Sequence, residues 1–244
     1  MRLEPSWGLL KPALENCCGS SQGYLLDSIE QMTSTNYQAM NLGAFLKELS
    51  SRAATPGGGA AAGLVAAMGA SLGAMVAALS QGIRYTSVAD SMKKLEERFL
   101  ESRDRCLIFA DQDSAAFQRW MAATRMSFED PAAREEALRA AIEGTCRPPM
   151  ALGKEVSGLQ DALATLQEHG NVRVLSDVGA ALALLTAALE ISILNLRINQ
   201  QGITDPCLRR QLIKSVASFD RSCAVMREWD SQIRSRLEGE EWNE

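Results

Sequence analysis

The hydrophobic positions along this chain recur mainly at helical spacing. The longest apolar stretch covers residues 53–83, because no residue between Arg52 and Arg84 is charged. At about 100° per residue, its small side chains gather on one side and its bulky side chains on the other. We therefore predict a helix from about Gly59 to Ile83 that is buried on both sides.

A second strongly apolar segment extends from Asp177 to about Gln200. It is apolar almost all round, which is typical of a helix at the centre of a bundle. Three polar side chains fall along one line of this helix, together with small residues: Asp177, Asn195 and Asn199. At helical spacing, we expect these three groups to share one face.

The remaining helical segments are amphipathic. They cover about 41–51, 90–123, 131–144, 150–168 and a segment after Pro206. No strand-like alternation and no hairpin signal is seen in the sequence. The pattern predicts an all-α bundle of about five to seven helices, two of them central and apolar.

Residues 1–40 differ from the rest of the chain in having only short apolar runs, interrupted by Pro5, Pro12 and clusters of small polar residues. Such a segment buries too little apolar surface to form its own core. We predict an N-terminal arm or extension at 1–40 and a single helical domain at 41–244.

The segment Thr55-Pro56-Gly57-Gly58-Gly59 precedes the long apolar helix. Pro56 stops a helix arriving from 41–51, because its ring and missing N–H break the hydrogen-bond ladder. The glycines can take backbone angles closed to other residues, and they leave their N–H groups uncovered. The next helix would point free N–H groups and its positive dipole end at this junction. Pro56, Gly57, Gly58 and Gly59 are therefore candidate binding residues.

Asp113 lies within the apolar stripe of the helix predicted at 90–123, together with Phe99, Phe109 and Phe117 at helical spacing. Burial of a carboxylate is costly unless it is paired, and desolvation raises its pKa toward the range that suits proton transfer. The alternative is a structural aspartate bonded to a backbone or arginine partner. Asp111, two residues earlier, is predicted to point to an ordinary solvated face.

Arg84 and Tyr85 directly follow the uncharged stretch and are candidates for binding an anion. The alternative is that Arg84 only complements the helix dipole, because arginine is common at helix C-termini. The one histidine and the scattered cysteines give no metal-site spacing. The net charge of −5 disfavours a nucleic-acid binder, which needs a basic face.

The uncharged stretch is also long enough to cross a bilayer. Its Ala and Gly content makes it only weakly hydrophobic, so we favour a buried helix without membrane contact. Six cysteines show no C-x-x-C pair, and no signal-peptide pattern is seen. We therefore expect a reduced chain in the cytoplasm.

Four blocks of sequence, in this order, resemble the cyclodeaminase/cyclohydrolase family. They are Ala54-Thr55-Pro56-Gly57-Gly58-Gly59 with the small-residue helix after it, Asp111-Gln112-Asp113-Ser114-Ala115-Ala116-Phe117, Gly170-Asn171 with Ser176-Asp177-Val178-Gly179-Ala180-Ala181, and Asn195-Leu196-Arg197-Ile198-Asn199. The resemblance covers about 42–206. That family comprises the C-terminal domain of formimidoyltransferase-cyclodeaminase and stand-alone methenyltetrahydrofolate cyclohydrolases.

The resemblance implies a dimeric, all-helical enzyme that acts on one-carbon derivatives of tetrahydrofolate, without a metal and without a permanently bound cofactor. The resemblance also implies that Asp113 would be the general acid/base, and that Asp177 would take part in proton transfer or bind pterin nitrogens. Asn195 and Asn199 would orient the pterin. Gly57 to Gly59 would supply N–H groups, and Arg84 would meet the glutamate tail.

The chain departs from the family pattern at two places. Ala60 stands where members commonly have Ser, and the segment Gly82-Ile83-Arg84-Tyr85 keeps one positive charge where a basic pair or triplet is common. Both departures weaken anion binding. The alternative is therefore a non-catalytic homologue that binds folate or serves as a scaffold or assembly partner.

Overall fold

The computed structural model describes residues 36–125 and 130–239. The described residues all belong to one compact unit. Nearly all of the arm predicted at 1–40 lies outside the described residues.

The described residues form α-helices and short 3-10 turns, without a strand, which confirms the predicted all-α class. The α-helices are α1 (Leu42–Leu49), α2 (Gly58–Leu79), α3 (Ala89–Arg125), α4 (Pro131–Thr145), α5 (Arg147–Ser157), α6 (Gln160–His169), α7 (Leu175–Asn199) and α8 (Pro206–Gly239). Most of the predicted helices are found within a few residues of their expected bounds.

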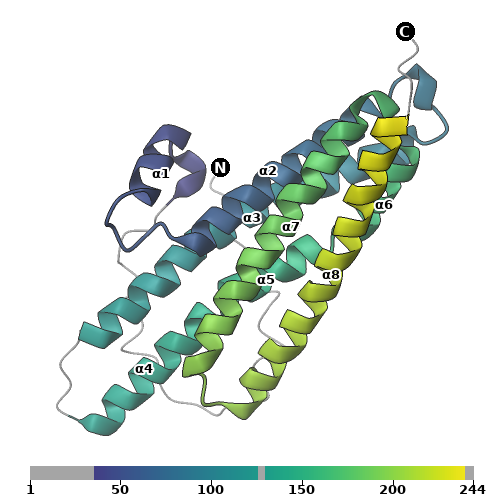
Figure 1. Cartoon of the computed structure of the whole chain (residues 1–244). Coiled ribbons are helices and arrows are strands. Elements are labelled where there is room, and N and C mark those ends of the chain that lie inside the picture. Colours follow the sequence, from purple (N-terminus) through teal and green to yellow (C-terminus); the bar gives the residue numbers. More distant parts are fainter. Residues whose placement is uncertain (1–35, 126–129, 240–244) are drawn as a thin grey trace. The chain divides into compact units, whose positions relative to one another are not determined.

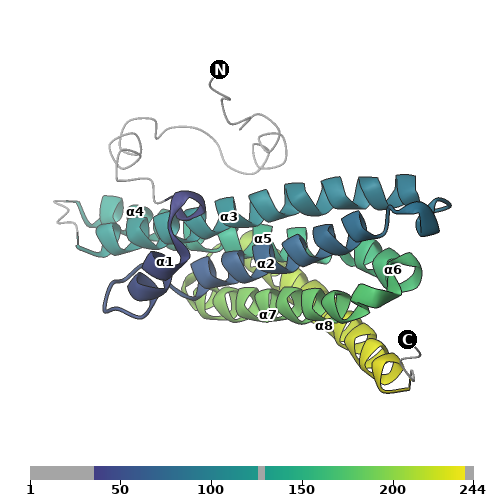
Figure 2. The same ribbon diagram turned by 90° about the horizontal axis from the view of Figure 1, so that it is seen from above.

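Helices α2 and α7 are the two central apolar helices that the sequence predicts. Helix α2 packs against α3 on one side and α7 on the other, and α7 packs in turn against α8. Figure 2 shows α3 and α7 on opposite sides of α2. Both neighbours run antiparallel to α2, as Figure 1 lets the reader follow along the chain colours.

The small residues of α2 are what bring its neighbours close. A Cβ added to Gly63 would lie 2.7 Å from the carbonyl oxygen of Cys106, and one added to Gly73 would lie 2.7 Å from the Phe99 ring. Such separations are shorter than van der Waals contact, so neither position has room for a side chain. The packing of α2 on α3 therefore depends on its glycines.

The segment after α4 differs from the expectation. In place of one helix from about Met150 to Glu168, the chain forms α5 and α6, separated at Gly158 and Leu159. Pro148 and Pro149 do not break the pattern but lie in the first turn of α5, where a missing N–H costs little.

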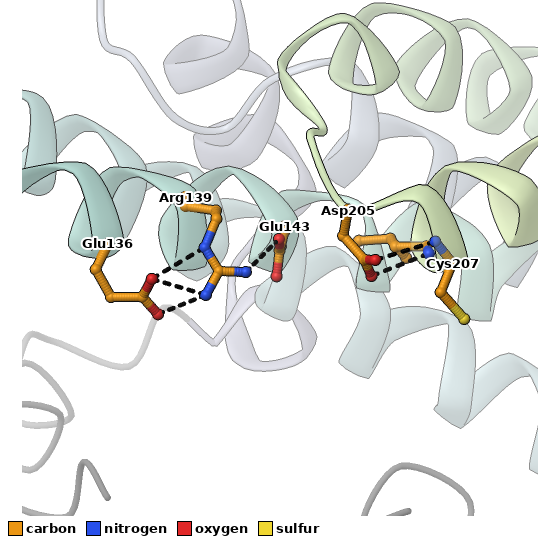
Figure 3. A network of polar contacts seen from close by, with 6 residues as sticks. Glu136, Arg139, Glu143, Asp205 and Cys207 are labelled. Atoms are coloured by element: carbon orange, nitrogen blue, oxygen red, sulfur yellow. Dashed lines mark hydrogen bonds and ion pairs between the residues drawn. The ribbon is translucent and has the colours of Figure 1, made fainter. Parts of the chain in front are cut away.

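Polar side chains fix the ends of the outer helices. The Asp205 carboxylate accepts hydrogen bonds from the backbone N–H groups of Cys207 (3.0 Å) and Leu208 (3.1 Å), and so caps the start of α8. On α4, Arg139 pairs with Glu136 and Glu143, which lie three and four residues away (Figure 3). These exposed pairs contribute little to stability.

Two helical segments, Gly58–Leu79 and Val172–Gly202, are long and apolar enough to cross a membrane. In each, 56% of the most apolar window is buried inside the bundle. Core helices of soluble proteins pass the same test of length and composition, so this finding is weak evidence for a membrane span.

Candidate functional site

A small cavity lies where the start of α2 meets α3, α5 and α7. It encloses about 180 Å³ of empty space and is lined by Gly59, Ala62, Phe109, Asp113, Pro148, Pro149, Leu152, Ser192 and Asn195. Three of these residues, Gly59, Asp113 and Asn195, belong to the set predicted from the sequence. Part of this space is open solvent and none of it admits a water molecule, so a ligand would lie mostly outside it.

Asp113 is half-buried on α3 and faces this cavity. Burial raises the pKa of its carboxyl to about 6, while a hydrogen bond from the backbone N–H of Ala60 acts in the opposite direction. The carboxylate thus lies at the N-terminus of α2, where the helix dipole favours a negative charge. A carboxyl group with this pKa can both accept and donate a proton near neutral pH.

Gly59 allows the carboxylate to come this close. A Cβ on Gly59 would overlap the Asp113 carboxyl group. None of the described glycines has a positive φ, and Gly57 has extended backbone angles. The prediction that the glycines adopt angles closed to other residues is therefore wrong, and Gly59 is needed for close approach instead.

The other members of the triplet are less enclosed. Pro56 is buried, Gly57 is half-buried and Gly58 is exposed at the first residue of α2. No side chain caps this helix. Of its first N–H groups, that of Ala60 donates to the Asp113 carboxylate, while those of Gly58 and Gly59 have no side-chain acceptor among the described residues.

Asn195 and Asn199 have different surroundings although they lie one turn apart on α7. Asn195 lines the cavity, and no hydrogen bond from its side chain to another described residue is found. The Asn199 amide donates to the carbonyl oxygen of Thr145 at 3.0 Å and thereby ties α7 to the end of α4. Of the two, Asn195 is the one placed to meet a ligand in the cavity.

Asp177, Arg84 and Tyr85 lie at the opposite end of the bundle from Asp113. Asp177 is in the first turn of α7, and the 18 residues between it and Asn195 correspond to about 27 Å of helix. Arg84 and Tyr85 follow the C-terminal end of α2. Shared helical phase did not bring these residues together, because residues can share a face of one helix and still be far apart along its axis.

The Tyr85 end is held by a hydrogen-bond network around Asn171. The Tyr85 hydroxyl donates to Asn171 Oδ1 at 2.8 Å, and the Asn171 N–H donates to the buried hydroxyl oxygen of Ser80 at 2.8 Å. Asn171 Nδ2 also donates to the Leu79 carbonyl oxygen. Tyr85 therefore has a structural role in the single chain.

The face of Asp111 is not the ordinary solvated face that was predicted. Asp111 is half-buried, and its carboxylate accepts a hydrogen bond of 2.7 Å from the backbone N–H of Tyr37. The Tyr37 hydroxyl lies 2.8 Å from Ser114 Oγ, and its ring packs edge-on against Phe45. Asp111 thus anchors the segment before α1, which the sequence alone did not place on this face.

Ala60 does not line the cavity. Its side chain is fully buried in a separate apolar cluster with Tyr37, Phe45 and Ala110. Residue 60 acts on Asp113 through its backbone N–H, which does not depend on the side chain. A serine hydroxyl at this position would point into that cluster and away from the cavity.

Several residues near Asp113 were not assigned to the site from the sequence. Phe109 and the two prolines of α5 line the cavity. Phe117, one helical turn beyond Asp113, was expected in the apolar stripe but is 38% exposed, with its ring centroid 5.4 Å from that of Trp120. The sequence signal that could have assigned Phe117 to the site was its spacing of four residues from Asp113, which places both side chains on the same face of the helix.

Groups of three or more His, Cys, Asp or Glu side chains that could hold a metal are not found within 36–125 and 130–239. The described site offers a carboxyl whose pKa is raised to about 6, helix N–H groups, an amide and apolar walls.

Comparison with known proteins shows the family of this chain. A family model described as formiminotransferase-cyclodeaminase matches residues 41–218. The chain belongs to this family. Its matched region contains both α2 and α7 and all the site residues predicted from the sequence.

Curated members of the family include two kinds of protein. The chain is 33% identical over 168 residues to the formimidoyltransferase-cyclodeaminase of Gallus gallus, covering 67% of this chain and 31% of that protein. It is 30% identical over 188 residues to the methenyltetrahydrofolate cyclohydrolase of Methylorubrum extorquens, covering 75% of this chain and 90% of that protein. The chain thus spans about one third of the vertebrate relatives it matches.

A solved structure with the same fold is the formiminotetrahydrofolate cyclodeaminase of Thermotoga maritima. It superposes with a TM-score of 0.76 at 25% sequence identity, covering 82% of this chain and 98% of that chain. Nearly the whole of that protein therefore has a counterpart in the helical unit described above.

Proposed function

We propose that this chain is an enzyme of tetrahydrofolate one-carbon chemistry, with Asp113 as its acid/base. The observation that carries the proposal is the Asp113 carboxyl at the cavity, with its pKa raised to about 6 beside the N-terminus of α2. Membership of the family and the names of its curated relatives support the substrate class.

The first candidate reaction is the cyclodeaminase reaction. Folate N10 attacks the carbon of the protonated formimidoyl group on N5 (N5–CH=NH2+), which forms a C–N10 bond and a tetrahedral carbon bearing an amino group. The Asp113 carboxylate accepts the N10 proton and returns it to that amino group. The C–N bond to the amino group then breaks, and ammonia leaves with 5,10-methenyltetrahydrofolate as the other product. One carboxyl with a pKa near neutrality serves both proton transfers.

The second candidate reaction is the cyclohydrolase reaction on the bridged cation. A water adds to the methenyl carbon, and the Asp113 carboxylate accepts the proton that the water loses. The Asp113 carboxyl then returns this proton to N5 as the C–N5 bond breaks, and the hydroxyl group on the tetrahedral carbon loses its proton to solvent, which leaves a formyl group on N10. Both reactions pass through the same kind of tetrahedral carbon at the same position, so one site geometry supports either.

The remaining predicted roles follow from position. Asn195 offers an amide to the polar edge of a pterin bound against the cavity, and the first N–H groups of α2 offer donors next to Asp113. Because the cavity is small, we infer that part of the substrate lies outside it, where the exposed Phe117 ring offers a stacking surface.

The alternative is a non-catalytic, folate-binding or scaffold homologue. Two departures from the family pattern favoured it, Ala60 and the single positive charge at Arg84. The first carries less weight in this fold, because the side chain of residue 60 is buried away from the cavity. The second departure, the single positive charge at Arg84, concerns a contact with an anion and does not affect Asp113 as the acid/base.

We further propose a cytoplasmic homodimer without a resident metal or a membrane or nucleic-acid partner. The acidic balance of the chain supports this setting, as do the free thiols of the four cysteines within the described residues, Cys106, Cys146, Cys207 and Cys223. A carbonate wash that left the protein in the membrane pellet would contradict the soluble assignment.

The decisive assay supplies purified protein with 5-formimidoyltetrahydrofolate and, separately, with 5,10-methenyltetrahydrofolate. Appearance or loss of methenyl absorbance reports each reaction. We expect turnover of at least one substrate, and the faster reaction identifies the activity. Absence of both, in a protein that still binds the methenyl compound, would favour the non-catalytic alternative.

A further inference from the structure

Helix α3 carries a stripe of polar side chains that do not line the cavity. The stripe consists of Asp111, Ser114 and Gln118, which lie three and four residues apart and therefore share one side of the helix. Asp113 points to a different side, because each residue turns the helix by about 100°. The cavity and the polar stripe are thus served by neighbouring sides of the same two turns of α3.

Each residue of the polar stripe binds the segment from Tyr37 to Thr55, which contains α1 and which we call the strap. The Asp111 carboxylate accepts the Tyr37 N–H at 2.7 Å, and Ser114 Oγ lies 2.8 Å from the Tyr37 hydroxyl. The Gln118 amide donates to Thr55 Oγ1 at 2.8 Å. Both ends of the strap are therefore fastened to α3.

The middle of the strap is held by one aromatic side chain. Among the residues of α1, Phe45 is the one that is buried, and its ring packs edge-on against that of Tyr37 with 5.2 Å between the centroids. The two rings form a buried cluster with Ala60 on α2 and Ala110 on α3. They therefore hold the first turn of α2 and the adjoining turn of α3 together from outside.

This cluster lies directly behind the groups that surround the Asp113 carboxyl. The Ala60 side chain packs under the rings, while its backbone N–H donates to the Asp113 carboxylate. The fit on the other side is tight, because a Cβ on Gly59 would overlap the carboxyl group. Of the residues that line the cavity, from α2, α3, α5 and α7, Asp113 is the only titratable one, so no charged neighbour there holds it in place.

The rest of α1 contributes little to this packing. Leu42 and Leu46 are 60% and 52% exposed although they belong to the same helix as Phe45. Tyr37 also precedes residue 41, where the match to the family model begins. The contact between the strap and the Asp113 site therefore depends on a few side chains of this chain, which single substitutions can remove.

We propose that Tyr37 and Phe45 are positioning residues for Asp113. They hold the first turn of α2 against α3, so that the Ala60 N–H reaches the carboxylate and water is kept away from it. The effect on catalysis rests on the proposed function, whereas the contact between the strap and the Asp113 site does not.

Phe45→Ala tests the inference without relying on turnover. Loss of the ring leaves a space behind Ala60 and lets water approach the Asp113 carboxyl, so its pKa should fall from about 6 toward its ordinary value of 3.8 by roughly one pH unit or more. A weaker hydrogen bond from Ala60 would act in the opposite direction, but burial is the larger cause of the raised pKa. NMR of protein made with isotope-labelled aspartate measures this pKa, and Asp113→Asn assigns the resonance.

Three further variants separate positioning from a general loss of stability. Leu46→Ala removes an exposed side chain next to Phe45 and should leave the pKa of Asp113 unchanged. Ser80→Ala weakens the fold at the far end of α2 and should also leave this pKa unchanged. Phe45→Leu refills most of the space and should restore most of the wild-type pKa. Circular dichroism and thermal unfolding show whether each protein is folded.

Kinetics provide the second measurement. Phe45→Ala should lower kcat by about tenfold to 100-fold with little change in KM, because a displaced acid/base slows the chemical step more than it weakens binding. The acid limb of its kcat/KM profile should move to lower pH together with the pKa of Asp113. Leu46→Ala should match the wild type in both respects.

Tyr37→Phe keeps the N–H bond to Asp111 and loses only the hydroxyl contact with Ser114, so it should give smaller changes in the same direction. It replaces Phe45→Ala if that variant does not fold. A folded protein with either substitution and a wild-type pKa at Asp113 would overturn the inference. If the wild type lacks turnover but its Asp113 pKa responds to Phe45→Ala, the proposed function fails and the positioning role stands.

Discussion

The two ends of α2 show how one helix serves two different purposes. At its start, α2 has no side-chain cap, and Gly59 leaves room for the Asp113 carboxyl. At its end, the Ser80 hydroxyl donates to the Val76 carbonyl oxygen and accepts the Asn171 N–H, while Tyr85 bonds the Asn171 amide.

The difference separates groups held for chemistry from groups held for stability. At the Ser80 end each buried polar group has a partner within the chain, which is the usual condition of a folded interior. At the Gly59 end a carboxyl is kept partly desolvated and close to free N–H groups, an arrangement typical of functional sites. Five predictions test this distinction, from the largest expected effect to the smallest.

Asp113→Asn should lower kcat by about 100- to 10,000-fold, because the amide can accept the Ala60 N–H but cannot shuttle a proton. Asp111→Asn is the matched control, since its amide oxygen can still accept the Tyr37 N–H, and kcat should stay near the wild-type value. Steady-state assays of both variants give the comparison. Equal, small effects would exclude Asp113 as the acid/base.

Gly59→Ala should lower kcat/KM by about 100-fold, because a misplaced catalytic group can cost that much and the new methyl would displace the carboxyl. Gly63→Ala is an equally tight site on the same helix, facing Cys106 and Ala110. It should cost roughly 1–3 kcal/mol of stability by overpacking, with kcat of the folded protein retained. Urea unfolding and kinetics together separate the two effects.

Ser80→Ala should lower the free energy of unfolding by about 1–3 kcal/mol, because it leaves the Asn171 N–H without its buried acceptor. Thr165→Ala, which removes an exposed hydroxyl on α6, should change stability by less than about 0.5 kcal/mol. Chemical denaturation provides both values. A loss of kcat at unchanged stability in Ser80→Ala would contradict the structural role of this end.

The pH dependence of kcat/KM should follow the raised pKa of Asp113. If the ionised carboxylate is the base, activity is full above about pH 6 and falls about tenfold for each unit below it. The fold favours the protonated form, since the folded pKa lies above the ordinary value of 3.8. Asp113→Asn should therefore gain stability relative to the wild type as pH rises from 4 to 7. If the variant gained no stability over this pH range, the Asp113 carboxyl would be solvated and its pKa would not be raised by folding.

Phe117→Ala should raise KM by about twofold to tenfold, the equivalent of roughly 0.5–1.5 kcal/mol of stacking, with little change in kcat. Phe117→Tyr keeps the ring and should restore KM. Because Phe117 contacts Trp120, tryptophan fluorescence can follow ligand binding independently of turnover. An unchanged KM in the alanine variant would remove Phe117 from the ligand surface.

Much of the fold was predictable because a helix is indicated by the residue pattern within its own segment. The small-residue face of α2 predicted close packing, which Gly63 and Gly73 confirm. Pro131 in a first turn predicted the start of α4, where Asp130 caps the helix. The division of α5 from α6 was not predictable, because Gly158 and Leu159 carry no strong breaker signal and proline is tolerated in a first turn.

The site was predictable only in part. Asp113 stood out because a carboxylate within an apolar stripe requires an explanation, and its neighbour Gly59 followed from the glycine triplet. Asp111 was misjudged because its partner, the Tyr37 N–H, comes from a segment 74 residues away in sequence. Phe117 was assigned to the core because periodicity shows which face a residue occupies and not what covers that face.

The sequence by itself determined the helical class, the two central helices and the carboxyl of Asp113, because each depends on spacing within one segment. Only the tertiary structure decided that Asn195 lines the same cavity as Asp113, whereas Asp177, Arg84 and Tyr85 lie at the other end of the bundle. Helical phase fixes direction around an axis, whereas position along that axis matters only once helices are packed side by side. Because α2 has 22 residues, or about 33 Å of helix, that axial separation keeps Arg84 away from the Asp113 carboxyl of its own chain.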